Sequence, residues 1–460
     1  MESTRKRLNK INAFIQAAVV LAAAAVFAAY FFTNIKVFKW YEFLLPFICL
    51  LGFTAIAVIS VPKIGNVLIG ESDFDPVMND SDKQRWKTFA VICLAVLLLH
   101  ALTYVLGVAV YGISRGFFSS AFWKTAWMKP NTDAQHYINI AENGYQVEGD
   151  DNLLLVFFPM LPFMIRAFNI VFANSYVSAT VINAAATSLT AGFAYLTFLP
   201  LVGKKHAVYA SFTVILLPGA IFMNSPMTEP LFMLFTILGL MFLQKRSYIA
   251  AGIFTALAGF TRSLGVLLAV SVAFVGIGHI VQLIKEKKSI GKTLITLVAG
   301  LLISILGTLG YLYINYRLHG DPFKFLEFQY GNWHQKASLF FDTPRYMLSS
   351  MLSRYASKPE TAISLWGVGF AAIYGALLII FVKAKKLPAS YIVYFLCYFA
   401  VSIGCTWLLS APRYLSAAFP LILAISLFAK KRISTIIMFT LVCSSYIIYM
   451  TMYMLRLGVY

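Results

Sequence analysis

The chain has 460 residues, of which 60% are hydrophobic and 12% are charged, and its mean hydropathy is +0.78. A water-soluble fold cannot bury that much apolar surface, so the composition excludes a soluble enzyme and predicts a polytopic membrane protein. The formal net charge of +19 does not indicate nucleic-acid binding, because Lys and Arg fall in short clusters at the ends of apolar runs.

Apolar runs recur along nearly the whole chain, and they are long enough to cross the roughly 30 Å hydrocarbon layer as helices. The first run follows a basic cluster and is too long for the core of a signal peptide, so we expect a retained helix. The predicted fold is all-α, with about 11 to 13 transmembrane helices. The expected spans are 11–33, 41–62, 88–113, 176–199, 206–224, 227–244, 248–260, 263–284, 293–316, 361–382, 389–409, 412–429 and 433–455.

Two segments differ from straight spans. Pro159 and Pro162 interrupt the run 157–172, and we expect this segment to return to its own side or to lie at the interface. The run 248–260 is short for a span, so the break at 261–263 is interpreted as a re-entrant kink.

Basic clusters set the orientation, since Lys and Arg beside spans concentrate in cytoplasmic loops. The clusters are 5–10, 83–87, 204–205, 245–246, 285–288, 383–386 and 430–432. The outer side then receives the large loops 114–156 and 317–360 and the polar turns 224–230, 261–263 and 410–414. These distant polar segments are expected to build one extracytoplasmic cavity. The residues in them that are expected to bind a substrate are His136, Tyr137, Glu229, Arg262, Gln329, Trp333, His334, Arg413 and Tyr414.

The large first outer loop carries Asp133 among amides, an imidazole and aromatics, with His136 and Tyr137 close behind. A carboxylate in this setting indicates chemistry at a membrane surface, and an amphipathic helix that starts just after it would hold the group at the lip of a lipid-facing cavity. A helix N-cap is the alternative role, because Tyr137, Ile140 and Ala141 follow at amphipathic spacing.

Glu229 and Arg262 are isolated charges within strongly apolar sequence. A charge at such depth costs several kcal/mol and needs a partner or a cavity. The two residues can form a purely structural ion pair. Alternatively, Arg262, or Arg413 in the turn that also holds Tyr414, binds a phosphate through its guanidinium fork.

The second large outer loop mixes aromatics with amides and imidazoles, including Gln329, Trp333 and His334. Such a wall suits a sugar ring, because aromatic faces stack on the ring and polar groups satisfy its hydroxyls. An interfacial aromatic belt explains Trp333 equally well.

An ordered series of short motifs resembles the PIG-V type of GPI mannosyltransferases and their bacterial relatives over about 115–425. Each motif is weak, and their order along the chain carries the resemblance. The matching pieces are Asp133-Ala134 with Tyr137, Ile140-Ala141 and Gly144-Tyr145; Phe157-Phe158-Pro159 with Pro162 and Arg166; Thr228-Glu229-Pro230-Leu231-Phe232; Thr261-Arg262-Ser263 with Gly265; Gly320-Asp321-Pro322 with Phe325 and Gln329; and Pro412-Arg413-Tyr414 with Phe419-Pro420.

The resemblance implies a GT-C-type glycosyltransferase that takes a sugar from a polyprenyl-phosphate carrier on the non-cytoplasmic side. The family's essential acid falls on Asp133. Two positions depart from the family pattern: Thr132 stands where Trp usually precedes the acid, and Pro230 stands where the family has Ser. The expected catalytic domain is 87–460, and 1–86 adds two N-terminal helices and a cytoplasmic loop.

The resulting hypothesis is an inverting transfer of a hexose, with mannose favoured by the family, and with Asp133 as the base. Arg262, Arg413 or His334 would stabilise the lipid-phosphate leaving group. No metal or other cofactor is expected, because a phosphodiester leaving group is already activated. The acceptor is a glycolipid, a glycan or a protein, and the location is the plasma membrane if the source is bacterial. A transporter or flippase of lipid-linked sugars is one alternative function, although the two halves of the chain show no convincing repeat. A noncatalytic lipid-binding membrane protein is another.

Overall fold

The computed structural model describes residues 2–74, 82–130, 132–406 and 408–460. Within these ranges the regular structure is helical, and one isolated antiparallel bridge joins Ala337 to Cys405. The expected all-α fold is confirmed. Residues 75–81 of the expected cytoplasmic loop, Asn131 of the first outer loop and Trp407 at the end of the span 389–409 lie outside the described residues.

Eight helical segments in the described ranges are long and apolar enough to cross a membrane, and the number is ten if each of two bent helix pairs forms one span. The chain is therefore an integral, multi-pass membrane protein. Two shorter apolar helices, α9 (Tyr248–Thr261) and α16 (Ala389–Ile403), lie among them. The long helices are α1 (Glu2–Asn34), α2 (Leu44–Leu68), α3 (Asp82–Arg115), α7 (Ser175–Leu216), α10 (Leu268–Lys285), α11 (Gly291–His319), α15 (Val368–Lys383) and α19 (Arg432–Met454).

Short 3-10 or π segments connect or extend several of these helices. They are η1 (Trp40–Phe43), η2 (Asp150–Val156), η3 (Pro218–Asn224), η4 (Ser263–Leu267), η5 (Ile363–Gly367) and η6 (Ala384–Lys386).

The bent pairs occur where prolines interrupt the apolar sequence. Helix η2 meets α6 (Met160–Phe172) at 108°, as expected for a segment that does not cross straight. Helix η3 meets α8 (Glu229–Gln244) at 110°, with Pro218 at the start of η3 and Pro230 in the first turn of α8. The second bend brings the polar turn before Glu229 into the bundle.

Two expected spans differ from the structure. The span predicted at 206–224 falls on two elements. Its first part is the end of α7, which is broken at Gly203 (φ 74°) and ends at Leu216, and its second part is η3. The span predicted at 412–429 forms two short helices, α17 (Ala411–Ser416) and α18 (Phe419–Ser426). At a rise of about 1.5 Å per residue neither crosses the hydrocarbon layer. Both carry a proline in the first turn, where the missing N–H costs no helical hydrogen bond.

The kink expected at 261–263 is present. Helix α9 ends at Thr261, Arg262 is extended (φ −156°, ψ 147°), and η4 leads into α10. The end of α9 is held by close packing against α11, because a Cβ at Gly307 would lie 1.8 Å from the Ala256 carbonyl oxygen. Small residues allow such backbone contact between membrane helices.

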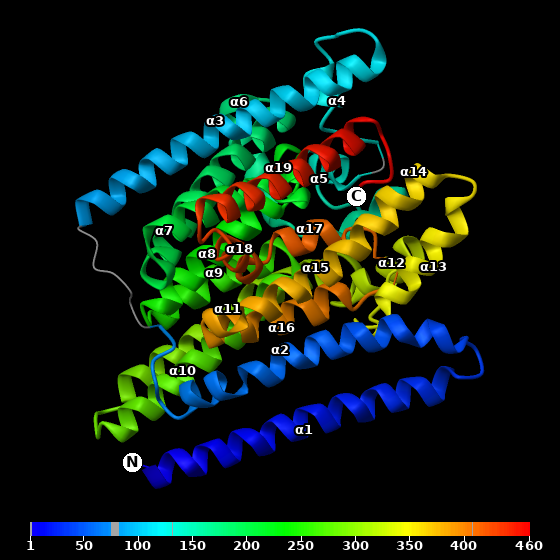
Figure 1. The fold of residues 1–460 in the computed structure, drawn as a ribbon. Helices are drawn as coiled ribbons and strands as arrows, with labels where there is room; N and C mark the ends of the chain where they lie inside the picture. The colour runs from blue at the N-terminus through cyan, green and yellow to red at the C-terminus, as the bar shows by residue number, and fades with distance from the viewer. Residues whose placement is uncertain (1, 75–81, 131, 407) are drawn as a thin grey trace.

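The two N-terminal helices form an antiparallel pair at one edge of the bundle, with α1 outermost and α2 against the rest (Figure 1). The segment after α2 ties this pair to α16. The Asp73 carboxylate accepts hydrogen bonds from the backbone N–H groups of Ala389 (2.6 Å) and Ser390 (3.0 Å), at the start of that helix.

Short polar helices gather at one end of the bundle: α4 (Phe122–Thr125), α5 (Asp133–Asn143), α12 (Lys324–Trp333), α13 (Thr343–Tyr355) and α14 (Pro359–Ala362) (Figure 1). The turn between α10 and α11, which follows Lys285, lies at the opposite end with the first turn of α3. Lys205 and Lys430, from two basic clusters, are neighbours, since the Lys205 ammonium donates to the Lys430 carbonyl (3.0 Å). The polar helices and the α10–α11 basic turn are thus separated along the bundle, as the sequence predicted.

Candidate active site

A cavity of about 690 Å³ lies among the polar turns and short helices. Residues from six separated parts of the chain line it, and most of the sequence-predicted site residues are among them. These predicted residues are Asp133, Tyr137, Arg262, Gln329, Trp333, His334, Arg413 and Tyr414.

Asp133 is the first residue of α5. The N-cap residue of this helix is Thr132, which is in an extended conformation (φ −121°, ψ 159°). The alternative of Asp133 as the N-cap is therefore wrong. Its carboxylate instead accepts a hydrogen bond from Arg413 Nη1 at 2.6 Å, and its side chain is 35% exposed toward the cavity. The first turn of a helix favours a carboxylate, because the partial positive charge of the helix dipole lies there.

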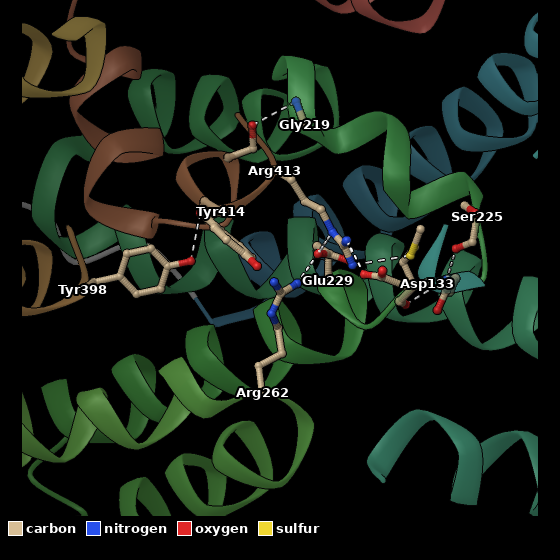
Figure 2. A network of polar contacts seen from close by, with 11 residues as sticks. Asp133, Gly219, Ser225, Glu229, Arg262, Tyr398, Arg413 and Tyr414 are labelled. Atoms are coloured by element: carbon tan, nitrogen blue, oxygen red, sulfur yellow. Dashed lines mark hydrogen bonds and ion pairs between the residues drawn. The ribbon is translucent and has the colours of Figure 1, made fainter. Parts of the chain in front are cut away.

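Arg413, on α17, is the centre of the polar network (Figure 2). Its side chain is 5% exposed and donates to Asp133 from Nη1 and to Glu229 from both Nε and Nη2, the last at 3.2 Å. The rigid fork of guanidinium donors suits this bridge between two carboxylates. Residues 280 positions apart in the sequence are joined in this way.

Arg262 donates from Nη1 to Glu229 Oε1, the oxygen that also accepts from Arg413 Nε. Its guanidinium carbon lies 4.9 Å from the ring centroid of Tyr414, and the Arg262 side chain lines the cavity at 13% exposure. The Glu229–Arg262 pair proposed from the sequence is present. The pair is part of a larger array, in which the guanidiniums of Arg262 and Arg413 balance the charge of the Asp133 and Glu229 carboxylates.

Glu229 and His136 are the predicted substrate-binding residues that lie outside the lining of this cavity. Glu229, the first residue of α8, is 2% exposed and lies behind the two arginines as their counter-ion. The His136 ring packs at 4.9 Å from the ring of Phe157. Burial lowers the pKa of His136, although the nearby charges of Asp133 and Asp151 act to raise it. Contact of either residue with a substrate stays a prediction; in the structure His136 packs against Phe157, and Glu229 bonds to the two arginines.

The second outer loop supplies another wall through α12 and the residues after it. Trp333 packs edge to face against Phe157 with ring centroids 5.8 Å apart, and Gln329 donates to the Gln335 side chain at 2.6 Å. His334 ends α12 in the left-handed region (φ 55°), and its carbonyl accepts from the Thr406 hydroxyl at 3.0 Å. Tyr137, from α5, faces the same cavity, and burial raises the pKa of its phenol.

Several residues that support the site were not predicted. The Ser416 hydroxyl accepts from the Gly219 backbone N–H at 3.0 Å and so joins α17 to η3. A Cβ at Gly219 would lie 2.4 Å from the Pro412 carbonyl oxygen, so this contact needs glycine. The Pro218-Gly219 pair is the sequence feature that could have indicated a turn at this contact. Tyr460 also lines the cavity, and nothing local in the sequence pointed to it.

Comparisons with known proteins identify the family. Residues 88–323 match the model of the mannosyltransferase (PIG-V) family, and this region contains the motifs of Asp133, Glu229 and Arg262. No curated protein matches the chain by sequence.

Similar solved structures include ArnT from Cupriavidus metallidurans bound to undecaprenyl phosphate, with 13% identity, a TM-score of 0.45 and coverage of 74% of this chain and 61% of that one. The apo oligosaccharyltransferase of Archaeoglobus fulgidus is 14% identical, with a TM-score of 0.42 and coverage of 80% and 56%. The chain thus spans less than two thirds of the length of either protein. From its matching region, the chain belongs to the mannosyltransferase (PIG-V) family of membrane glycosyltransferases.

Proposed function

We propose that this protein transfers a hexose, with mannose favoured, from a polyprenyl-phosphate sugar to a hydroxyl of an extracytoplasmic acceptor. The observation that carries the proposal is the row Asp133–Arg413–Glu229–Arg262 at the cavity, in a chain that belongs to a mannosyltransferase family. The row combines a partly exposed carboxylate with the buried guanidinium of Arg413 and the 13% exposed guanidinium of Arg262, which are the groups that such a transfer needs.

In the proposed reaction the Asp133 carboxylate takes the proton of the acceptor hydroxyl. The acceptor oxygen forms a bond to the anomeric carbon while the bond from that carbon to the phosphate oxygen breaks. The electron pair leaves on the lipid phosphate, and the configuration at the anomeric carbon is inverted. Positioned general bases of this kind contribute about 10²- to 10⁴-fold to the rate.

The lipid phosphate would bind Arg262 and Arg413, which line the cavity. Glu229 holds both guanidiniums in fixed positions, since it accepts hydrogen bonds from each of them. Preorganised donors of this kind stabilise charge that develops on a leaving group, because they need no reorganisation during the reaction. His334, also on the cavity lining, is a further candidate phosphate contact.

The sugar would lie among the aromatic side chains of the cavity, of which Tyr137, Trp333 and Tyr414 were predicted from the sequence. Aromatic faces and hydrogen-bonding groups together suit a hexose ring. The basic clusters favour an active site on the extracytoplasmic face. The catalytic domain would be 87–460, with α1 and α2 as additional helices.

The purified protein is expected to move label from a polyprenyl-phosphate [¹⁴C]mannose donor to an added membrane extract. Asp133→Asn is expected to lower this transfer by about 100-fold or more with normal expression and membrane insertion. Asp151→Asn is the matched control, because Asp151 is an exposed acid that bonds to Asn139 (3.0 Å) away from the arginines.

Near-normal transfer by the Asp133→Asn protein would remove the assignment of Asp133 as the base. Wild-type protein that carries the labelled lipid across a vesicle membrane without forming a new glycoside would favour the flippase alternative.

A further inference from the structure

The segment after α19 folds back onto the outer loop that leads to Asp133. Arg456 Nη1 donates to the Ala126 carbonyl at 3.0 Å, and Val459 is completely buried. The Tyr453 hydroxyl, at the end of α19, donates to the Trp127 carbonyl at 3.1 Å. Residues 453–460 are therefore packed against residues 125–129, although the two segments are more than 300 positions apart.

Lys129 is the centre of this contact. Its ammonium donates to the carbonyls of Leu457 (2.6 Å) and Val459 (3.1 Å) and lies 4.5 Å from the ring centroid of Tyr460. Lys129 is 5% exposed, and burial together with the charge of Arg456 lowers its pKa to about 8. A buried ammonium held by two carbonyls and an aromatic ring fixes the position of that ring.

The same lysine is linked to the candidate base. The Thr132 hydroxyl donates to the Lys129 carbonyl at 2.7 Å, and Thr132 is the N-cap residue directly before Asp133. Tyr460 and Asp133 both line the cavity. The ring of Tyr460 is thus tied, through Lys129 and Thr132, to the part of the site that holds the carboxylate.

The order of charges gives the two ends of the site different roles. In an inverting displacement the attacking oxygen and the leaving oxygen lie on opposite sides of the anomeric carbon. Asp133 is at one end of the polar row and Arg262 at the other, with Arg413 and Glu229 between them (Figure 2). The end with Asp133 is therefore the acceptor end, and the end with Arg262 is the phosphate end.

We propose that Tyr460 contacts the acceptor, that the acceptor presents a sugar or polyol ring, and that Lys129 is the positioning residue for Tyr460. The inference rests on the proposed transfer reaction. An aromatic ring beside the attacking hydroxyl stacks on the C–H face of a sugar ring, which the side chain of a serine or threonine acceptor does not have.

The test uses full-length purified protein, polyprenyl-phosphate [¹⁴C]mannose as donor and octyl α-mannoside as acceptor. Two rates are measured: transfer to octyl mannoside, and release of free mannose by water when no acceptor is added. Tyr460→Ala is expected to raise the KM for octyl mannoside about tenfold, which corresponds to ~1.4 kcal/mol, with donor KM and hydrolysis unchanged. Tyr460→Phe keeps the ring and is expected to stay within about twofold of wild type.

Lys129→Met is expected to raise the acceptor KM in the same direction, because it releases the carbonyls of Leu457 and Val459. Tyr330→Ala is the control, since Tyr330 is an exposed aromatic outside the cavity lining. An unchanged acceptor KM in Tyr460→Ala, or an equal fall in transfer and hydrolysis, would overturn the inference while leaving the proposed function intact. A wild-type protein that neither transfers nor hydrolyses contradicts the proposed function itself and this inference with it.

Discussion

The guanidinium of Arg413 lies 2.6 Å from the carboxylate of Asp133, and the same guanidinium bonds to Glu229. Arg413 is therefore the counter-ion of the candidate base, and the buried carboxylate of Glu229 holds Arg413 in position. Asp133 belongs to the first outer loop and Arg413 to a short helix 280 positions later in the chain, so the tertiary fold alone creates this pair.

Arg413→Lys is expected to lower transfer by about 100-fold, the size of effect seen when one preorganised donor is removed from an active site. A single ammonium keeps the charge but does not reproduce a fork that reaches Asp133 and Glu229 together. The measurement is the initial transfer rate at saturating donor. Arg317→Lys, at an exposed position in the last turn of α11, is the control. An Arg413→Lys protein with more than half of the wild-type rate would contradict the role of the fork.

Glu229→Gln is expected to destabilise the protein by about 3–5 kcal/mol, because it leaves the buried Arg413 and the largely buried Arg262 short of a counter-charge. Thermal unfolding in detergent measures the change. The double variant Glu229→Gln with Arg262→Gln restores the charge balance and should recover part of the lost stability. If the double variant is less stable than the single one, the charge-balance explanation is wrong.

His136→Gln is expected to keep the transfer rate within about twofold of wild type, since His136 packs behind Phe157 rather than on the cavity lining. Its pKa is lowered by burial from the usual 6.5, so the unfolded chain binds a proton that the folded chain does not. Wild-type protein therefore loses stability as the pH falls below about 6.5, and the variant should lose less. Unfolding temperatures of both proteins at pH 7 and pH 5 test this; equal losses would exclude His136 as a source of acid sensitivity.

Gly307→Ala is expected to prevent normal folding or to lower the yield strongly, because the new Cβ would meet the Ala256 carbonyl oxygen at 1.8 Å. The contact is with backbone, so no side chain can move aside. Gly375→Ala on α15 is the matched control, since its Cβ meets nothing within 4 Å. The measurement is the yield of monodisperse protein from each variant after detergent extraction. Equal yields of the two variants would argue against the close α9–α11 contact.

The proposed orientation predicts that single cysteines replacing the exposed residues Glu148 and Glu360 react with a membrane-impermeant maleimide in intact cells. A cysteine replacing Lys287, in the exposed turn between α10 and α11, should react only after the membrane is opened. The five native cysteines are first replaced. Labelling of position 287 but not 148 in intact cells would reverse the orientation and move the site to the cytoplasmic face.

Hydropathy and charge patterns along the chain predict its membrane environment, the position of most helices and the group of residues from which the candidate site is built. Hydropathy and basic clusters are local properties of a membrane chain, since each apolar run must satisfy its backbone hydrogen bonds as a helix wherever it packs. Asp133, Arg262 and Arg413 stood out because charges and polar turns are costly in apolar surroundings. The match of the family to residues 88–323 agrees with the motifs found there.

Which of these groups contact one another follows from the packing of the helices and cannot be read from the chain. Contacts between distant segments place Arg413 between Asp133 and Glu229. They also leave Glu229 and His136 outside the cavity lining and bring Tyr460 into that lining. The short helices α17 and α18 replaced an expected span for the same reason. Their apolar residues are buried against other helices, and a hydropathy profile does not distinguish burial in protein from contact with lipid.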